Sequence, residues 1–191
     1  MTARRIDILF SAEAIAERNR TLAAEIRDAG FRDDVLVVAV LKGGFVFAAD
    51  LIRALHGAGI SPEVDFMSLS SYRAGTESSG HVTVLRDLET DVVGRNVLLV
   101  DDILESGRTL AFARQLMIDR GAARVGIAVL LDKHGRRAVP FEGDFVGFVC
   151  PDLFVVGYGM DMGHAYRELP YIGHVVAGDD RGPAAPGPQG E

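Results

Sequence analysis

Three short, almost uninterrupted runs of apolar residues constrain the fold of this chain more than any other feature. They are VLVVAVL at 35–41, VLLV at 97–100 and VGIAVLL at 125–131. None approaches the ~20 apolar residues that a membrane-spanning helix needs. A short strand that is apolar on both faces is typical of a parallel sheet covered on both sides. We therefore predict buried strands at 35–41, 96–100 and 125–131.

Segments with helical spacing alternate with these strands. Ser11 is a good N-cap residue, and Ile15, Leu22 and Ile26 follow it at helical spacing, so we expect a helix over 11–29. Alternating strands and helices indicate an α/β fold, with a central, mostly parallel sheet flanked by helices. The other predicted elements are helices at 45–56 and 110–120 and strands at 63–70, 81–86, 145–149 and 154–156.

The length of 191 residues predicts one domain. The last fifteen residues, AGDDRGPAAPGPQGE, contain three of the seven prolines and no large apolar residue, which predicts a disordered tail at 177–191. SYRAGTESSG at 71–80 is polar and rich in Gly and Ser, as is typical of a mobile loop. We therefore expect a single folded domain over 1–176, with a flexible loop at about 70–81.

The charge and cysteine content exclude several classes of protein. The formal net charge is −7, from 20 basic and 27 acidic side chains, whereas a general nucleic-acid binder needs a basic face. An anionic ligand would therefore need local positive charge. One cysteine allows neither an internal disulfide framework nor a multi-cysteine zinc site. Asp7 interrupts the first apolar stretch, so we expect no signal peptide, no membrane association and a cytoplasmic location.

The segment NVLLVDDILESGRTL at 96–110 carries the clearest chemical signal. A buried strand leads to the paired carboxylates of Asp101 and Asp102, and a Gly-containing turn then opens a helix. Such a turn offers backbone N–H groups and the positive end of a helix dipole to a phosphate. Paired aspartates accept hydrogen bonds from vicinal hydroxyls or hold hydrated Mg²⁺. This pattern indicates a ribose-5-phosphate site, and the alternative is an ordinary strand–turn–helix capped by Ser106.

VLLVDDILESGRTL resembles the phosphoribosyl-pyrophosphate (PRPP) signature of type I phosphoribosyltransferases. LKGG at 41–44 resembles the family's pyrophosphate loop, and SSY at 70–72 resembles the start of its flexible catalytic loop. The resemblance runs from about Val35 to Gly173. It implies the type I phosphoribosyltransferase fold, with a small hood subdomain, mainly 132–175, built from the C-terminal segment and the N-terminal region. The segments that resemble the hood of hypoxanthine(-guanine) phosphoribosyltransferases are DKHGRR at 132–137, PDLFVVGYGMD at 151–161 and YRELPYIG at 166–173.

The resemblance implies transfer of a 5-phosphoribosyl group from PRPP to N9 of a 6-oxopurine, with Mg²⁺ as cofactor and pyrophosphate as product. Asp101 and Asp102 match the acidic pair that faces the ribose hydroxyls and a Mg²⁺ ion, and Asp161 matches a residue that helps to hold a second Mg²⁺. Glu105 stands where the family usually has an aspartate, which is the proposed general base for the purine N7 proton. The extra methylene displaces the carboxylate by on the order of 1 Å, enough to affect proton transfer.

The resemblance also assigns the phosphate ligands. The 5′-phosphate cradle is Ser106, Gly107, Arg108 and Thr109, next to Glu105. Lys42 and Gly43 match the pyrophosphate loop, in which a strained or cis peptide before the lysine is characteristic. Arg137 and Arg167 match arginines directed at the pyrophosphate, and Ser71 and Tyr72 would close over it and exclude water.

The purine ligands follow from the same resemblance and from one physical argument. A cation at Lys133 suits the O6 atom of hypoxanthine or guanine and is poorly matched to the amino group of adenine. Phe154 would stack on the purine, Val155 would offer backbone groups to its edge, and Asp161 lies in the same block. We expect a homodimer or homotetramer on resemblance alone. Two alternatives stay open: a xanthine-preferring enzyme, and a catalytically weak PRPP-binding regulator, which only Glu105 favours.

Overall fold

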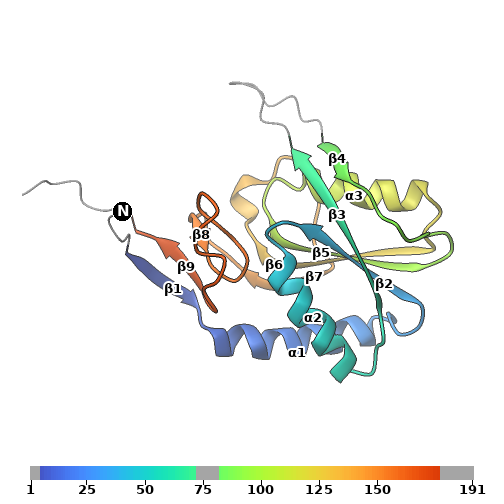
Figure 1. The fold of residues 1–191 in the computed structure, drawn as a ribbon, viewed down its shortest axis with the longest axis horizontal. Coiled ribbons are helices and arrows are strands. Elements are labelled where there is room, and N and C mark those ends of the chain that lie inside the picture. The colour runs from blue at the N-terminus through green and yellow to red at the C-terminus, as the bar shows by residue number, and fades with distance from the viewer. Residues whose placement is uncertain (1–4, 72–81, 177–191) are drawn as a thin grey trace, which may run out of the picture.

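The computed structural model describes residues 5–71 and 82–176, which form two sheets and three α-helices (Figure 1). The six-stranded sheet has the order β4-β3-β2-β5-β6-β7, and the three-stranded sheet has the order β1-β9-β8. The strands are β1 (Ile6–Phe10), β2 (Val35–Leu41), β3 (Glu63–Ser71), β4 (Val82–Arg86), β5 (Asn96–Leu104), β6 (Arg124–Asp132), β7 (Phe145–Val149), β8 (Val155–Val156) and β9 (Ile172–Val175). The helices are α1 (Ala12–Asp28), α2 (Phe45–Gly57) and α3 (Arg108–Asp119), with a 3₁₀ turn, η1, at His134–Arg136.

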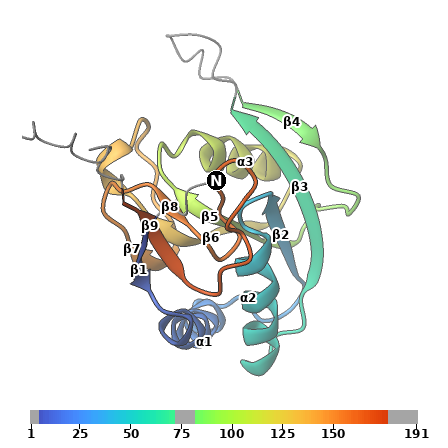
Figure 2. The ribbon, with the colours of Figure 1, turned by 60° about the vertical axis from the view of Figure 1, so that its left-hand side comes forward.

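The larger sheet confirms the predicted α/β fold. Strands β3, β2, β5, β6 and β7 pair in parallel, and only the edge strand β4 is antiparallel. Helices α1 and α2 cover one face and α3 covers the other (Figure 2). The central strands are therefore buried on both sides, and every residue from Val35 to Val40 is buried. Each fully buried aliphatic side chain contributes about 1.5–3 kcal/mol.

Helix α1 begins and packs as its sequence predicts. The Oγ atom of its N-cap residue, Ser11, accepts a hydrogen bond of 3.3 Å from the backbone N–H of Ala14. Ile15, Leu22 and Ile26 are buried against the sheet. No helix among residues 5–71 and 82–176 is long and apolar enough to cross a membrane.

Strand β5 is longer than predicted and corrects one expectation. We placed its end at Val100, with the two aspartates after it, but the strand continues to Leu104. It continues because β6 runs alongside it, with Asp101 opposite Val129 and Leu104 opposite Asp132. Both aspartates are thus held by strand pairing.

The small sheet joins segments from opposite ends of the chain. Strand β1 pairs with β9, with Ile6 opposite Val175, and β9 pairs in turn with β8. Neither β1 nor β9 was predicted. Strand β8 begins at Val155, so Phe154 lies just before the strand that we expected to include it. The predicted tail at 177–191 and most of the predicted flexible loop lie outside the described residues.

Candidate active site

The acid pair, Asp101 and Asp102, lies in strand β5, where Asp101 is buried and Asp102 is half-buried. One oxygen of Asp101 accepts a hydrogen bond from the backbone N–H of Asp102 (2.9 Å), and one of Asp102 accepts from Ile103 N–H (2.8 Å). Burial raises the pKa of Asp101 well above its usual range, and the neighbouring charge of Asp102 raises it further. Burial also raises the pKa of Asp102, although its hydrogen bonds and the charge of Arg167 act to lower it. A cation bound here would relieve this electrostatic cost.

The pyrophosphate loop, Lys42–Gly44, packs directly on the acid pair. The Leu41–Lys42 peptide is cis, as the resemblance implies. A Cβ atom on Gly43 would lie 1.7 Å from Oδ2 of Asp102, and one on Gly44 would lie 3.3 Å from the Cα of Asp101. A side chain at Gly43 would therefore displace the Asp102 carboxylate, and one at Gly44 would require a smaller shift of the backbone. The loop therefore meets the acids through its backbone, while the Lys42 side chain is exposed.

The phosphate turn, Glu105–Thr109, joins β5 to α3. Gly107 is the N-cap residue of α3 and adopts the left-handed conformation, with φ of +80°. It provides no capping side chain, and the first N–H groups of a helix have no partner within the helix. The backbone N–H of Arg108 lies 3.3 Å from the Ser106 hydroxyl. This geometry suits an anion at the N-terminus of α3.

The segment that follows β6 holds the phosphate turn in place. Ala138 N–H donates to the Ser106 carbonyl at 2.9 Å. Arg137 donates from Nη1 to the Glu105 carbonyl at 2.9 Å and, from Nη2, binds Asp132, which is 2% exposed. The structure thus places Arg137 against the phosphate turn, where its guanidinium group already has two partners.

Glu105, the candidate base, points its carboxylate toward a second arginine. Its side chain is one-third exposed, and Oε1 lies 3.5 Å from Nη1 of Arg136. The Nε atom of Arg136 also binds Asp152 at 2.7 Å. Exposed ion pairs contribute little to stability. These pairs instead affect the position of the Glu105 side chain, because Arg136 links it to Asp152, just before Phe154.

The candidate purine ligands gather at the ends of β6 and β8. Lys133 is 6% exposed, and its Nζ atom donates a 2.7 Å hydrogen bond to the Leu153 carbonyl. Phe154 is 58% exposed, whereas Val155 is buried and pairs with His174 of β9. A buried ammonium group therefore lies beside an exposed aromatic ring, which suits a flat base with a carbonyl oxygen.

Asp161 and Arg167 form an ion pair in the hood loop, which we define as Gly157–Arg167. The Nη2 atom of Arg167 lies 2.7 Å from Oδ1 of Asp161, and its Nη1 donates to the Gly159 carbonyl at 2.5 Å. The positive charge of Arg167 also opposes the rise in the pKa of Asp102, so it acts on the acid pair. The structure therefore brings these two predicted residues to the same site as the acids.

Four residues near the site were not singled out from the sequence: Asp132, Arg136, Asp50 and Tyr158. The sequence did contain a signal for Asp132. A carboxylate at the end of a buried strand needs a cationic partner, and two arginines follow it at 136 and 137. The pairing of Asp50 with Tyr158 had none, because 108 residues separate them. Of the predicted loop residues, Ser71 ends β3 and Tyr72 lies outside the described residues.

The fold and the site define a class of protein. The model of the phosphoribosyl transferase domain family matches residues 5–162. This match covers most of the chain, and the chain belongs to that family.

Named relatives narrow the similarity further. The chain is 43% identical to a hypoxanthine phosphoribosyltransferase of Escherichia coli (strain K12), over 87% of this chain and 90% of the relative. It is similar to a solved hypoxanthine-guanine phosphoribosyltransferase of Bacillus anthracis, with a TM-score of 0.84, 41% identity, and coverage of 91% of this chain and all of that one. It is also similar to a Trypanosoma cruzi hypoxanthine phosphoribosyl transferase, studied for the role of its C-terminal region in oligomeric state and activity (TM-score 0.84, 36% identity, 92% and 93% coverage).

Proposed function

We propose that this chain is a purine-salvage enzyme that transfers the 5-phosphoribosyl group of PRPP to N9 of hypoxanthine, and of guanine. The bond from C1′ to pyrophosphate breaks, the bond from C1′ to N9 forms, and the purine loses one proton. The observation that carries the proposal is the common location of the acid pair, the pyrophosphate loop and Arg167, in a chain 43% identical to an enzyme of that name. The products are IMP or GMP and pyrophosphate.

The phosphate turn is the proposed site of the 5′-phosphate. Gly107 gives the turn its left-handed bend, and the first N–H groups of α3 point at the ligand with the positive end of the helix dipole. The hydroxyls of Ser106 and Thr109 add donors. Backbone N–H groups and hydroxyls provide most of this cradle, so it suits an anion although the chain as a whole is acidic.

The pyrophosphate is proposed to lie between the pyrophosphate loop and Arg167. Lys42 and Arg167 supply positive charge, and the loop supplies backbone groups next to Asp102. Arg137 is proposed to act from beside the phosphate turn. These cations provide the local positive charge that an anionic ligand needs on a chain with a net charge of −7.

The residues fit a magnesium ion that is shared with the substrate. Among residues 5–71 and 82–176, no group of three or more His, Cys, Asp or Glu side chains could hold a metal on its own. Mg²⁺ characteristically binds one or two carboxylates together with substrate phosphates. Asp101 and Asp102 provide such carboxylates, and Asp161 is proposed to help at a second ion. When bound, Mg²⁺ would neutralise charge on the pyrophosphate leaving group.

The purine is proposed to stack on Phe154, with its O6 atom toward Lys133. One Lys133 N–H already binds the Leu153 carbonyl, and an ammonium group has three donors. Val155 would offer backbone groups to the edge of the base. Adenine carries an amino group at position 6 and would place N–H against N–H, so this site favours 6-oxopurines.

Glu105 is proposed as the general base for the N7 proton of the purine. Its backbone carbonyl is fixed by Arg137, and its carboxylate faces Arg136. Ser71 and Tyr72 are proposed to close over the bound pyrophosphate, and a homodimer or homotetramer in the cytoplasm stays a prediction.

The test is to incubate the purified chain with PRPP and Mg²⁺ and, separately, hypoxanthine, guanine, xanthine and adenine. Nucleotide formation is followed by chromatography. We expect IMP and GMP, with little product from adenine. Product mainly from xanthine would show that xanthine is the preferred substrate instead of hypoxanthine or guanine. Product mainly from adenine would contradict the proposed role of Lys133. PRPP binding without product from any base would indicate a regulator instead of an enzyme.

A further inference from the structure

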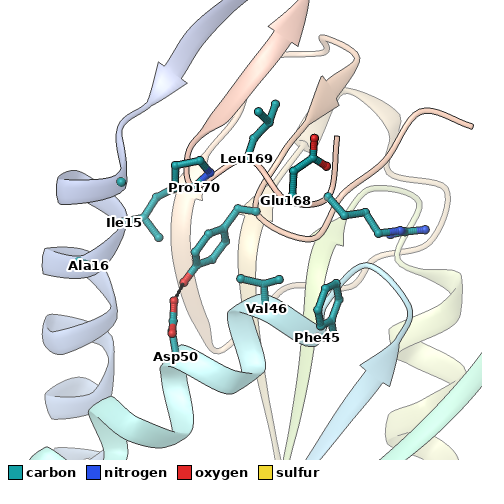
Figure 3. A pocket seen from close by; sticks show the side chains of 11 residues that line it. Ile15, Ala16, Phe45, Val46, Asp50, Glu168, Leu169 and Pro170 are labelled. Atoms are coloured by element: carbon teal, nitrogen blue, oxygen red, sulfur yellow. Dashed lines mark hydrogen bonds between the residues drawn. The ribbon is translucent and has the colours of Figure 1, made fainter. Parts of the chain in front are cut away.

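Tyr158 connects three parts of the molecule through its hydroxyl group. The hydroxyl donates a 2.6 Å hydrogen bond to Oδ2 of Asp50 on α2, and accepts a 2.9 Å hydrogen bond from Nδ2 of Asn19 on α1. Tyr158 itself belongs to the hood loop and is 5% exposed. Tyr158 and Asp50 line a hollow of about 650 Å³ together with Ile15 and Ala16 of α1, and Figure 3 shows the hydrogen bond to Asp50 as a dashed line. No candidate substrate ligand takes part in this cluster.

The backbone around Tyr158 is bent in a way that only a firm attachment maintains. Tyr158 has a φ of +50°, between Gly157 at +95° and Gly159 at +98°. A non-glycine residue in this region is uncommon, and it persists only where its surroundings hold it there. The two hydrogen bonds to helices α1 and α2 contribute to that attachment, together with a 2.8 Å hydrogen bond from the Tyr158 N–H to the Leu169 carbonyl. Burial and the Asp50 carboxylate both raise the pKa of Tyr158, so the hydroxyl remains a donor at neutral pH.

The same short segment lies against the pyrophosphate loop. A Cβ atom on Gly159 would lie 2.3 Å from the carbonyl oxygen of Gly43, so the two backbones are in direct contact. Gly43 in turn contacts Asp102. Gly159 also exchanges hydrogen bonds with Arg167: its N–H donates to the Arg167 carbonyl (3.0 Å), and its own carbonyl accepts from the guanidinium group (2.5 Å).

We propose that Tyr158 is a positioning residue for the binding of PRPP, because its hydrogen bonds to Asp50 and Asn19 fix the hood loop over the pyrophosphate loop. This inference rests on the proposed function. Tyr158 touches no substrate in this account. It acts through Gly159 on Gly43, and through Gly159 on the Arg167–Asp161 pair, so it sets where the positive charge of Arg167 lies. The purine ligands Lys133 and Phe154 lie outside this chain of contacts.

The first test is Tyr158→Phe, which removes the hydroxyl and keeps the ring. We expect the KM for PRPP to rise about fivefold to tenfold, the size expected for one lost buried hydrogen bond. The KM for hypoxanthine and kcat should each stay within about twofold. Tyr171→Phe is the matched control, because Tyr171 belongs to the segment just after the hood loop and its hydroxyl is not part of the cluster.

Two substitutions of Asp50 separate positioning from a general loss of stability. Asp50→Asn keeps an oxygen that accepts from Tyr158 and should leave the KM for PRPP near that of the unchanged chain. Asp50→Ala removes the acceptor and should raise that KM as much as Tyr158→Phe does. The double variant Tyr158→Phe with Asp50→Ala should be no worse than either single one, since both remove the same bond. These variants also serve if Tyr158→Phe does not fold.

The outcomes are distinguishable. Equal rises in the KM for PRPP and for hypoxanthine, or a change in thermal unfolding alone, would show that Tyr158 is only structural and overturn the inference. Failure of Asp50→Asn to retain PRPP binding would overturn it as well. If the unchanged chain makes no nucleotide, the proposed function fails, and this inference fails with it. An active chain with an unaffected Tyr158→Phe variant refutes the inference alone.

Discussion

The phosphate turn and the hood loop supply ligands to one site, yet they are held in different ways. The phosphate turn joins β5 to α3, and the residues on either side of it, Leu104 and Leu110, are buried in the core at 1% and 2% exposure. The hood loop follows the two-residue strand β8 and contains several residues with positive φ. Tyr158 and Met160 pack into the core near the start of the loop, and polar contacts of Tyr158 and Arg167 hold it as well.

This difference separates stability from placement. Buried residues on both sides of the phosphate turn, together with hydrogen bonds from Arg137 and Ala138, fix it to the larger sheet. The hood loop depends more on its own hydrogen bonds and close glycine contacts, so a small change there moves ligands without unfolding that sheet. Active-site elements are commonly drawn from the less stable parts of a fold. Substitutions in the phosphate turn and in the hood loop test this difference between stability and placement.

Replacing the candidate base in the phosphate turn should cause the largest loss. Glu105→Gln keeps the shape of the side chain but cannot accept the purine proton. We expect kcat to fall about 100-fold or more, the usual contribution of general base catalysis, with the KM for PRPP changed less than about twofold. Steady-state kinetics will measure both. Glu142→Gln, at an exposed acid beyond the turn, is the control, and an unchanged kcat for Glu105→Gln would exclude it as the base.

Alanine at one glycine in each region compares the two directly. Gly159→Ala places a methyl group 2.3 Å from the Gly43 carbonyl, which is backbone. Gly107→Ala places it 3.1 Å from the Val139 and Phe141 side chains, which can shift. Alanine at positive φ costs about 1–2 kcal/mol at either site, and the clash adds roughly 1–3 kcal/mol at Gly159. Urea unfolding will give the two free energies.

A third glycine calibrates that comparison. Gly163 has a φ of +60°, and nothing lies within 4 Å of a Cβ placed there. Gly163→Ala should therefore show the backbone cost alone, about 1–2 kcal/mol. Equal losses at Gly159 and Gly163 would mean that contact with the pyrophosphate loop adds nothing.

Removing the exposed ring beside the hood should affect ligand binding and leave stability almost unchanged. Phe154 is 58% exposed, so Phe154→Ala removes few core contacts. Stacking on a base contributes roughly 1–3 kcal/mol, so we expect the KM for hypoxanthine to rise about tenfold. Phe66→Ala, at another exposed phenylalanine on β3, is the control. A loss of stability without a change in that KM would argue against stacking.

The smallest predicted effect is a gain in stability. Burial raises the pKa of Asp101 in the folded protein. When folding raises the pKa of an acid, the protein loses stability as the pH rises from the unfolded-state pKa to the folded-state pKa. Asp101→Asn removes this cost and should raise the stability of the ligand-free protein at pH 8. The gain should shrink toward pH 4. Thermal unfolding at the two pH values will measure it, and a gain independent of pH would point to another cause.

The parts of the fold that the sequence predicted are those with local signals. The apolar runs predicted the bounds of β2 and β6 to within one residue, and Ser11 predicted where α1 begins. The end of β5 was wrong because Asp101 and Asp102 look like the end of a strand, while pairing with β6 carries the strand on to Leu104. Strands β1 and β9 were missed because each is short and finds its partner at the other end of the chain.

The candidate site divides in the same way. The acid pair and the phosphate turn are contiguous in sequence, so residue type and spacing were enough to propose them. Contacts such as Gly159 with Gly43, or Tyr158 with Asp50, join residues more than a hundred positions apart and leave no pattern in a single sequence. Those contacts decide how the ligands are oriented toward one another.

The pairing of β1 with β9 also sets an order of events during synthesis. Strand β1 leaves the ribosome first, but it pairs only with β9, which ends at Val175. The six-stranded sheet needs nothing beyond Val149 and can pair while later residues are still being added. A nascent chain would thus complete the phosphate turn well before the hood. The proposed purine ligand Val155, which pairs with His174, would therefore be held in place only when almost all of residues 5–176 have been made.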